Sequence, residues 1–561
     1  IPVTHIPAAA AAPIPARARR RLRPPPGNIT EVRQVMPKVL IADKLSASAV
    51  EVFERRGIEV EVATGLSGDE LAAKLPGFDG LAVRSATKVT REVLDQVEGL
   101  RVVGRAGVGV DNIDLEAATE RGVVVMNTPG GNSVTTAEHA ISLMLALARR
   151  IPAANASTKA GKWEKSKFTG VEVTGKTLGL IGCGNIGAIV AERARGLKMR
   201  VVAYDPYLSG ERARDLGIRK VETLDELYEV ADFITLHVPK TEQTEGMIDA
   251  AALQRMKPGV RIVNCARGGL IVEQDLADAI KAGQVAGAAI DVYAQEPAKE
   301  NPLFELEETV CTPHLGASTS EAQEKVAVQV AEQMADYLTT GAVANALNMP
   351  SLTAEESERL GPYMRLAEQL GSFAGQLTET GLQSVTIEYE GAVARESTRP
   401  LTQAALAALL RPMLDAVNMV NAPVIARERD IEVSEVTHER ASAYQTLVRV
   451  TVSTERQTRS VAGTLFGADK PRIVEIKGIP IEAELGPHML YITNEDKPGL
   501  IGALGSALGE AGVNIATFHL GRANRGADAL ALIEIDDAVS EDTLNKVRAL
   551  PLIKQAKRLR F

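Results

Sequence analysis

Short apolar runs alternate with helical hydrophobic patterns along the N-terminal part of the chain. The apolar runs predict buried strands at residues 38–41, 59–62 and 80–83, and a second series near 178–181, 200–204, 232–236, 261–264 and 286–290. Helical patterns lie between them, for example at 46–56 and from about 135 to 150. Alternation of strand and helix is typical of parallel α/β domains with helices covering the sheet faces.

Beyond residue 350 this alternation gives way to longer strands. A helix is expected at 354–377 and another at 402–410, with strands at 384–389, 432–435, 445–454 and 473–476. From residue 488 the order is βαββαβ. With a length of 561 residues, the patterns predict roughly four domains.

Composition narrows the possible functions. The net charge is −9 and no long basic stripe occurs, which argues against a nucleic-acid-binding surface. The longest apolar helical run, residues 140–148, is too short to cross a membrane. Three widely spaced cysteines without a CxxC motif fit a reducing compartment.

Residues 1–36 differ in composition from the rest of the chain. Glu31 is the first acidic residue, and an Ala/Pro tract precedes an arginine cluster at 17–23. An acid-poor, arginine-rich leader is typical of a transit peptide, so we expect import into the plastid stroma, with the mitochondrion as the alternative. Transit peptides are usually rich in serine, but this segment is poor in it. A disordered basic tail is therefore the competing interpretation.

A glycine motif follows the apolar run at 178–181. Gly182, Gly184 and Gly187 form GxGxxG at an expected strand-to-helix turn, and Asp205 ends the next strand. Such glycines permit a tight turn, close approach of a pyrophosphate and close helix packing. The helix N-terminus favours phosphate, and the terminal acid favours a ribose 2′-hydroxyl, so the motif predicts NAD rather than NADP.

Four later loops carry candidate chemistry, and all are expected at the carboxyl edge of one sheet. They span residues 236–240, 264–269, 291–297 and 312–317 and include Arg267, Glu296 and His314. Arginine can hold a carboxylate, histidine can exchange a proton, and glutamate can raise the imidazole pKa. From spacing alone, His314 is either a general base or a structural histidine, and no metal-ligand spacing links it to His139 or His237.

Two more arginines lie where strands of this part of the chain end. Arg84 begins RSATK after residues 80–83, and Arg105 lies where a further strand from residue 100 ends in a glycine-rich loop at 107–109. Guanidinium groups at strand ends suit an anionic substrate, although surface ion pairs are an equal alternative. The glycine-rich loop is either a second phosphate cradle or a tight turn.

These motifs resemble the D-isomer-specific 2-hydroxyacid dehydrogenases over about residues 37–338, in order and separation. The resemblance implies two Rossmann-like domains with the active site between them: a substrate-binding domain of residues 37–129 and 316–343, and an NAD-binding domain of residues 130–315. It implies that Arg267, Glu296 and His314 are the catalytic set and that Asp291 lies against the nicotinamide amide. The residues implied to contact NAD are Gly182, Gly184, Asn185, Ile186, Gly187, Asp205, His237, Val238, Pro239, Ala266, Arg267, Asp291, His314 and Gly316.

Segments 83–90, 104–114 and 161–170 resemble one branch of this family, and that resemblance implies oxidation of 3-phospho-D-glycerate to 3-phosphohydroxypyruvate on the route to serine. The substrate would contact Arg84, Ser85, Arg105, Gly107 and Val108. Lys165 or Lys167 would add charge across a dimer interface, and Trp163 is expected in an interface or core. Another D-2-hydroxyacid dehydrogenase, such as a glyoxylate or hydroxypyruvate reductase, is the alternative. A non-catalytic NAD-sensing regulator is a further one.

The C-terminal half resembles the regulatory part of longer family members. Residues 344–484 resemble their intervening domain, and this resemblance implies a turn at 463–467. In this domain Lys470 and Arg472 either bind an anion or are solvated. Residues 485–561 resemble a ferredoxin-like ACT domain, which binds amino acids between paired subunits. Asn494, Asp496 and Asn514 would contact the effector, often serine, although the Asp-Lys-Pro-Gly at 496–499 is also an ordinary helix-entry turn. The resemblance implies a homo-oligomer, expected to be a tetramer.

Overall fold

The computed structural model describes residues 36–414, 416–439, 443–467 and 469–561. Contacts separate the chain into a unit of residues 1–36 and a unit of residues 37–561. The expected leader lies outside the described residues except for Met36, so its targeting role stays a prediction. No helix in the described part of the chain is long and apolar enough to cross a membrane.

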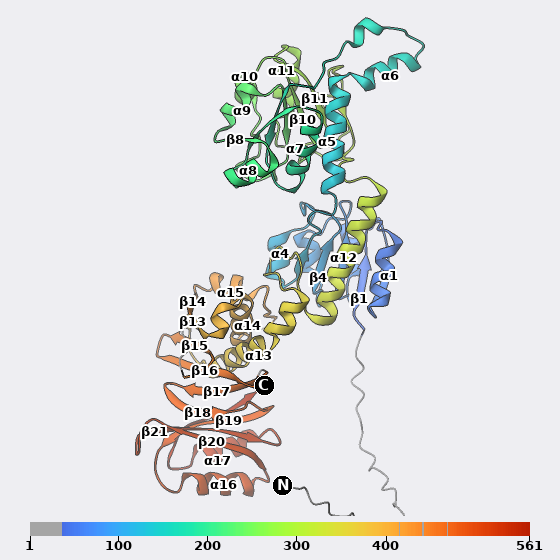
Figure 1. Ribbon diagram of the computed structural model, residues 1–561. Coiled ribbons are helices and arrows are strands. Elements are labelled where there is room, and N and C mark those ends of the chain that lie inside the picture. The colour runs from blue at the N-terminus through green and yellow to red at the C-terminus, as the bar shows by residue number, and fades with distance from the viewer. Residues whose placement is uncertain (1–35, 415, 440–442, 468) are drawn as a thin grey trace, which may run out of the picture. The chain divides into compact units, whose positions relative to one another are not determined.

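The first domain is a parallel five-stranded sheet with strand order β2-β1-β3-β4-β5. The strands are β1 (Lys38–Ile41), β2 (Glu59–Val62), β3 (Gly80–Val83), β4 (Val102–Arg105) and β5 (Val124–Met126), and the early helices are α1 (Ala47–Arg55), α2 (Gly68–Lys74), α3 (Arg91–Asp95) and α4 (Leu115–Glu120). Helix α12 (Ser320–Thr340), far along the chain, packs beside α1 and β4 (Figure 1). A Cβ at Gly104 would collide with Met334 and Val330 of α12, so this glycine allows the close approach.

The second domain is a parallel seven-stranded sheet with strand order β12-β11-β10-β9-β6-β7-β8. Its strands are β6 (Thr177–Ile181), β7 (Arg200–Tyr204), β8 (Arg219–Val221), β9 (Phe233–Leu236), β10 (Val260–Asn264), β11 (Val285–Ile290) and β12 (Thr309–Cys311), and its helices include α5 (Ser133–Ala148), α7 (Asn185–Gly196), α8 (Gly210–Leu216), α9 (Leu224–Val230), α10 (Ala250–Arg255) and α11 (Glu273–Lys281). The strand order reverses between β6 and β9, and open α/β sheets bind ligands beyond the strand ends at such a point.

The helix expected from 135 to 150 is longer and divided. Arg150, with φ +53, separates α5 from α6 (Ile151–Lys159). Helix α6 buries none of its residues, and a turn and loop at 160–164 connect it to the short 3₁₀ helix η1 (Lys165–Phe168). A non-glycine residue in the left-handed region costs free energy and ends the regular helix there.

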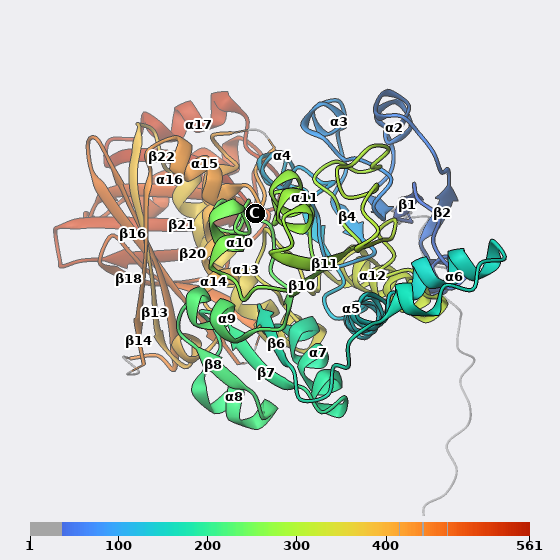
Figure 2. The same ribbon diagram turned by 90° about the horizontal axis from the view of Figure 1, so that it is seen from above.

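The third domain, which Figure 2 shows with helix α13 (Ala354–Gln376) beside its strands, is a six-stranded sheet with strand order β14-β13-β15-β16-β17-β18. Its elements are β13 (Leu382–Gly391), β14 (Glu432–His438), β15 (Thr446–Thr454), β16 (Thr458–Phe466), β17 (Lys470–Ile476), β18 (Ile479–Ala483), α13 (Ala354–Gln376), α14 (Arg399–Leu410) and α15 (Ala422–Glu428). The turn expected at 463–467 was wrong, because residues 463–466 pair within β16 and only Gly467 turns, with φ +66. Gly371 and Gly375 let α13 approach the α14 backbone, where a Cβ would meet the Ala405 and Leu409 carbonyls.

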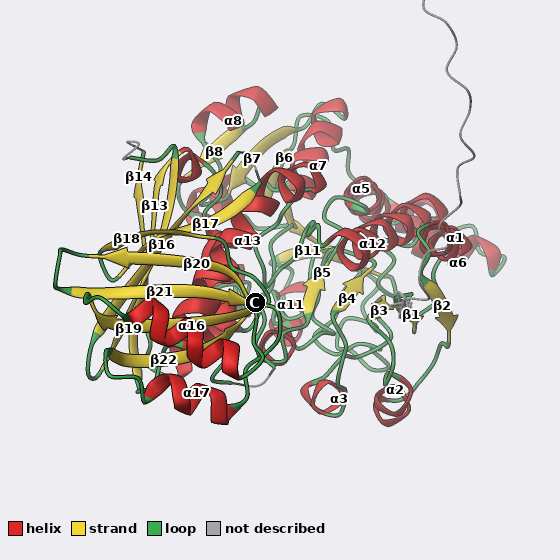
Figure 3. Cartoon of the chain, turned by 90° about the horizontal axis from the view of Figure 1, so that it is seen from below, coloured by secondary structure: helices red, strands yellow, loops and turns green. Residues whose placement is uncertain are grey.

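The last domain is an antiparallel sheet with strand order β20-β21-β19-β22. Its elements are β19 (His488–Glu495), α16 (Leu500–Glu510), β20 (Ile515–Arg522), β21 (Asp528–Ile535), α17 (Glu541–Arg548) and β22 (Ile553–Arg560). Figure 3 shows α16 and α17 side by side along this sheet. The expected fold class is confirmed: two parallel-sheet domains, an α+β domain and a ferredoxin-like domain.

Candidate active site

The glycine turn after β6 has the geometry that its sequence predicts. Gly182 has φ +90, and a Cβ there would meet the carbonyl oxygen of His237. A Cβ at Gly187 would strike the carbonyl of Gly182, so this glycine allows helix α7 to pack against the turn. A Cβ at Gly184 would meet no atom within 4 Å. Packing within the chain therefore does not require glycine there, which fits a position kept open for a phosphate.

Asp205 at the end of β7 points back to this turn. Its Oδ2 accepts from the backbone N–H of Cys183 at 2.7 Å, and its Oδ1 accepts from the N–H of Tyr207 at 2.8 Å. Helix α7 begins after Gly184, so Asn185 and Ile186 form its first turn. The carboxylate is thus held beside the helix N-terminus, where the sequence predicts the ribose of NAD.

His237 follows β9 on the opposite side of the switch point. Its backbone N–H donates to the Ile181 carbonyl at 2.7 Å, and its Nε2 lies 3.0 Å from Thr235 Oγ1. Burial lowers the pKa of His237 to about 4, so the ring is neutral at neutral pH. A neutral ring here fits a wall of the nucleotide cleft, with Val238 and Pro239, and does not fit an acid–base role.

His314 and Glu296 form an ion pair at the same sheet edge. His314 Nδ1 lies 2.7 Å from Glu296 Oε2, and the other carboxylate oxygen accepts from the N–H of Tyr293 at 3.0 Å. The hydrogen bond with Glu296 raises the pKa of His314 above its usual value despite burial. Burial opposes ionisation of Glu296, but hydrogen bonds from His314 and Tyr293 outweigh it and lower the Glu296 pKa. With Nδ1 engaged, Nε2 is left to exchange a proton with a ligand.

Replacing Glu296 by glutamine removes the negative charge beside His314 and is expected to lower the His314 pKa. Oxidation of an alcohol needs the neutral ring as base, so the acidic limb of kcat/KM against pH should move to lower pH. Rate profiles of wild type and variant measure the shift. Glu273→Gln is a matched control, because Glu273 accepts from Ala294 N–H of the same loop and leaves His314 untouched. If the acidic limb of Glu296→Gln lies at the same pH as that of wild type, a group other than His314 determines it.

Arg267 is held by the loop after β10. Asn264 binds this loop at two points, since its Oδ1 accepts from Ala266 N–H and its Nδ2 donates to the Arg267 carbonyl. The guanidinium Nε donates to Asp111 Oδ2 at 3.1 Å, and Nη1 donates to the Ala266 carbonyl at 2.6 Å. A Cβ at Gly109 would collide with the guanidinium. The glycine-rich loop at 107–109 therefore makes room for Arg267.

Asp291 follows β11 and is fully buried. Its oxygens accept from the N–H groups of Leu315 and Gly316, at 2.8 and 2.9 Å. Burial opposes ionisation, but hydrogen bonds from His139, Thr312 and Leu315 outweigh it and lower the Asp291 pKa. In this conformation both oxygens of the Asp291 carboxylate accept hydrogen bonds from the chain itself, and neither is exposed. The expected contact with a nicotinamide amide therefore finds no exposed carboxylate oxygen.

Arg84 lies in a loop shaped by two polar residues that the sequence patterns did not single out. Asp43 Oδ2 accepts from the N–H of Arg84 at 2.6 Å and from that of Thr87 at 3.2 Å. Asn112 Nδ2 donates to the carbonyls of Arg84 and Thr87, both at 2.7 Å. Ser85 is exposed in this loop. Asp43 directly follows β1 at the same sheet edge, and that position was the signal available in the sequence.

Arg105 ends β4 and is partly buried. Its Nε is buried and finds no hydrogen-bond partner among the described residues. A Cβ at Gly107 would collide with its guanidinium, and the Val108 carbonyl accepts from Asn127 Nδ2 at 2.6 Å. Burial, with repulsion from Arg267 and Arg84, lowers the Arg105 pKa to about 10. Arg84, Arg105 and Arg267 thus concentrate positive charge at this site, and a ligand with several negative charges would neutralise it.

The segment after α6 is exposed. Trp163 is 88% exposed, so core packing was the wrong alternative for this residue. Lys167 Nζ pairs with Glu307 at 3.0 Å within the same domain, and Lys165 lies on η1 beside it. The ammonium group of Lys167 is therefore paired with a carboxylate of its own chain.

The three expected effector residues lie in separate local networks. Asn494 is buried, and its Nδ2 donates to the Glu495 carbonyl at 2.8 Å. Asp496 Oδ2 accepts from Gly526 N–H at 3.0 Å and lies 3.4 Å from Arg522 Nη1. Asn514 Nδ2 donates to Asp536 at 2.8 Å. In the third domain, Arg472 pairs with Glu484.

Three family models match the chain. The NAD-binding domain of the D-isomer specific 2-hydroxyacid dehydrogenases matches residues 141–316, the D-3-phosphoglycerate dehydrogenase intervening domain matches 359–477, and the ACT domain matches 488–552. The chain is 43% identical over 520 residues to D-3-phosphoglycerate dehydrogenase of Methanocaldococcus jannaschii, covering 92% of this chain and 99% of that one. The chain belongs to the D-3-phosphoglycerate dehydrogenase family.

Other family members and structures agree with this assignment. D-3-phosphoglycerate dehydrogenase of Bacillus subtilis is 40% identical over 524 residues, or 93% of this chain and 99% of that one. The crystal structure of the TT0316 protein of Thermus thermophilus matches with TM-score 0.51 and 35% identity, over 55% of this chain and 99% of that one. The expected family, its NAD-binding domain and its dehydrogenase class are confirmed.

Proposed function

We propose that this protein oxidises 3-phospho-D-glycerate to 3-phosphohydroxypyruvate with NAD, at the entry to serine biosynthesis. The observation that carries the proposal is the cluster of Arg84, Arg105 and Arg267. Burial, and after it repulsion from Arg267 and Arg84, lowers the Arg105 pKa to about 10. A substrate bearing both a phosphate and a carboxylate suits such a cluster, because guanidinium pairs bidentately with either group. The D-3-phosphoglycerate dehydrogenases that match nearly the whole chain support the same substrate.

The catalytic step follows from the positions of three side chains. His314 Nε2 takes the proton of the C2 hydroxyl, while Nδ1 stays paired with Glu296, which stabilises the imidazolium that forms. The glycine turn after β6 and Asp205 would hold NAD, which would supply a hydride acceptor for the C2 hydrogen. Arg267 holds the substrate carboxylate and stabilises the charge on the C2 oxygen as it becomes a carbonyl. The reverse reaction uses the imidazolium as the acid.

The phosphate requirement tests this proposal. Initial rates of NADH formation with 3-phospho-D-glycerate and with D-glycerate should differ in kcat/KM by roughly 10²-fold or more, the effect of losing charge-assisted hydrogen bonds to arginine. Arg84→Met should reduce this ratio of kcat/KM values, because it removes one of the arginines proposed to bind the phosphate. Arg121→Met is the matched control, because Arg121 pairs with Asp95 on the surface of the same domain. Equal efficiency with both substrates would favour another D-2-hydroxyacid dehydrogenase.

We propose also that the ACT domain binds L-serine and that the chain forms a homotetramer. The ACT match and the position of Asp496 in the loop between β19 and α16 support effector binding. Helix α6 buries none of its residues, and its exposed Ile151 and the exposed Trp163 that follows the helix support an interface. Adding serine to the same rate assay should reduce turnover, and light scattering should give the mass of four chains. Unchanged rates at saturating serine, or the mass of one chain, would contradict the respective proposal.

A further inference from the structure

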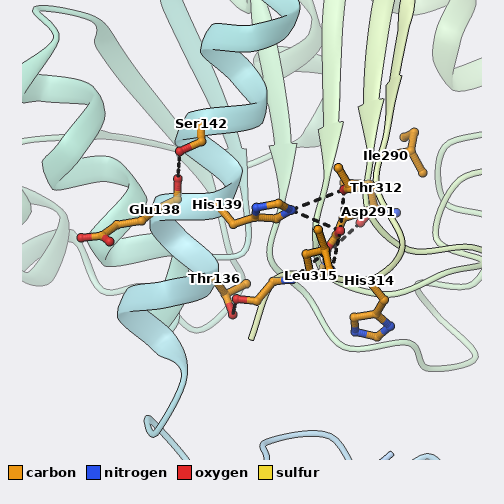
Figure 4. Close-up of polar contacts among 12 residues, drawn as sticks. Thr136, Glu138, His139, Ser142, Ile290, Asp291, Thr312, His314 and Leu315 are labelled. Carbon is orange, nitrogen blue, oxygen red and sulfur yellow. Dashed lines mark hydrogen bonds and ion pairs between the residues drawn. The ribbon is translucent and has the colours of Figure 1, made fainter. Parts of the chain in front are cut away.

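Helix α5 reaches the catalytic edge of the second sheet through one histidine. Figure 4 shows the His139 ring pointing from α5 toward Asp291 and Thr312. Its Nε2 lies 3.2 Å from Asp291 Oδ1 and 3.4 Å from Thr312 Oγ1, and its side chain is 19% exposed. No sequence motif contains this residue, so the contact is visible only in the structure.

Asp291 in turn holds the turn that carries His314. Its Oδ1 accepts from Leu315 N–H and Thr312 Oγ1, at 2.8 and 2.6 Å, and its Oδ2 accepts from Gly316 N–H at 2.9 Å. Its backbone carbonyl accepts from His314 N–H at 2.9 Å. His314 itself has φ +54, a conformation that needs support from its surroundings in a non-glycine residue.

Helix α5 contacts the same turn a second time. Thr136 Oγ1 donates to the Gly316 carbonyl at 3.0 Å, one helical turn before His139. Both contacts from α5 act on the 314–316 turn. His139 acts on it through the Asp291 carboxylate, and Thr136 bonds to it directly. The orientation of His314 is therefore connected to α5 through the Asp291 carboxylate and through the Gly316 carbonyl.

The other titratable groups near Asp291 do not replace His139. They are Cys265, Tyr293, Glu296 and His314. Burial and Asp291 raise the pKa of the Cys265 thiol, and burial raises that of Tyr293. Among the described residues His139 is the one basic side chain within ion-pair distance of Asp291. His139, Cys265 and Asp291 are close enough to ligate a metal, but a thiol that resists ionisation and an Asp291 oxygen already bonded twice favour hydrogen bonding.

We propose that His139 is a positioning residue, whose Nε2–H donates to Asp291 and thereby holds that carboxylate and the 314–316 turn in their catalytic geometry. The proposal rests on the proposed function of His314 as the base. The negative charge of Asp291 also raises the His314 pKa. Loss of the donor should therefore change both the rate and the titration of His314, even though His139 touches neither substrate nor base.

The test compares three replacements at this position in the full-length protein. His139→Leu and His139→Asn remove the donor from Asp291, whereas the amide of His139→Gln reaches the position of Nε2. The first two are expected to lose roughly tenfold or more in kcat/KM, the effect of one hydrogen bond to a charged group, and to move the acidic limb of the pH profile to lower pH. His139→Gln should restore most of both. Ser142→Ala, on the exposed face of α5, is the matched control.

Histidine NMR separates this inference from the proposed function. The chain has seven histidines, and His314→Ala identifies the signal of His314. A lower His314 pKa in His139→Leu or His139→Asn, restored in His139→Gln, supports the inference even if wild type makes no NADH from 3-phospho-D-glycerate. That result would refute only the proposed function. An unchanged His314 pKa in the donor-less variants overturns the inference, as does an equal loss of rate and melting temperature in all three variants with an unmoved titration.

Discussion

Replacing His314 by alanine is expected to lower kcat by roughly 10²–10⁴-fold, the range for loss of a general base, while NAD still binds. The pair with Glu296 engages Nδ1, so Nε2 is the atom available to take the hydroxyl proton. The variant removes that atom but leaves the glycine turn and Asp205 in place. Initial rates at saturating substrate and calorimetric titration with NAD measure the two quantities separately.

The chain offers a histidine for comparison. His438 lies exposed at the end of β14, in another domain, and His438→Ala should leave turnover unchanged. Turnover of His314→Ala close to wild type would remove His314 from the chemistry. Loss of NAD affinity together with a lowered melting temperature would instead assign it a structural role.

Replacing Arg267 by methionine is expected to lower kcat/KM by roughly 10²–10³-fold, the effect of losing one donor that stabilises charge at the reacting oxygen. The methionine keeps much of the side-chain length but carries no charge. Arg267→Lys should recover only part of the loss, because an ammonium group keeps the charge without the planar pair of donors. Steady-state kinetics with 3-phospho-D-glycerate give both values.

Arg255 provides the matched comparison for Arg267. It lies on α10 of the same domain, pairs with Asp225 on the surface and is away from the sheet edge that carries the loops. Arg255→Met should retain the wild-type kcat/KM. A similar loss in both variants would mean that the Arg267 effect reflects general destabilisation of the domain.

Secondary structure in the α/β part was largely predictable from local pattern. The strands β6, β7, β9, β10 and β11 begin and end within a residue or two of their expected positions. The short strands β5, β8 and β12, of three residues each, were not expected. A three-residue strand has too little periodicity to be recognised, and it forms because a longer neighbour supplies its hydrogen-bond partners.

The glycine turn and the catalytic loops were visible in the sequence because their chemistry is local. Gly182 needs a positive φ, and a strand followed by such a turn brings its own helix N-terminus to the phosphate site. Parallel strands also place their carboxyl ends at one edge, so Arg267, Glu296 and His314 could be expected together from strand order alone. Their functional roles came from family resemblance, since spacing left His314 open.

Only the tertiary structure decided which distant groups restrain those loops. Asp43 and Asn112 shape the Arg84 loop, Gly109 admits Arg267, and His139 reaches Asp291 from a helix with no motif of its own. The sequence by itself determined the strands, the nucleotide turn and the candidate catalytic set, because backbone preference and hydrophobic period depend on neighbouring residues. Contacts between side chains far apart in the chain depend on how helices and sheets pack, and that packing positions the base against its partners.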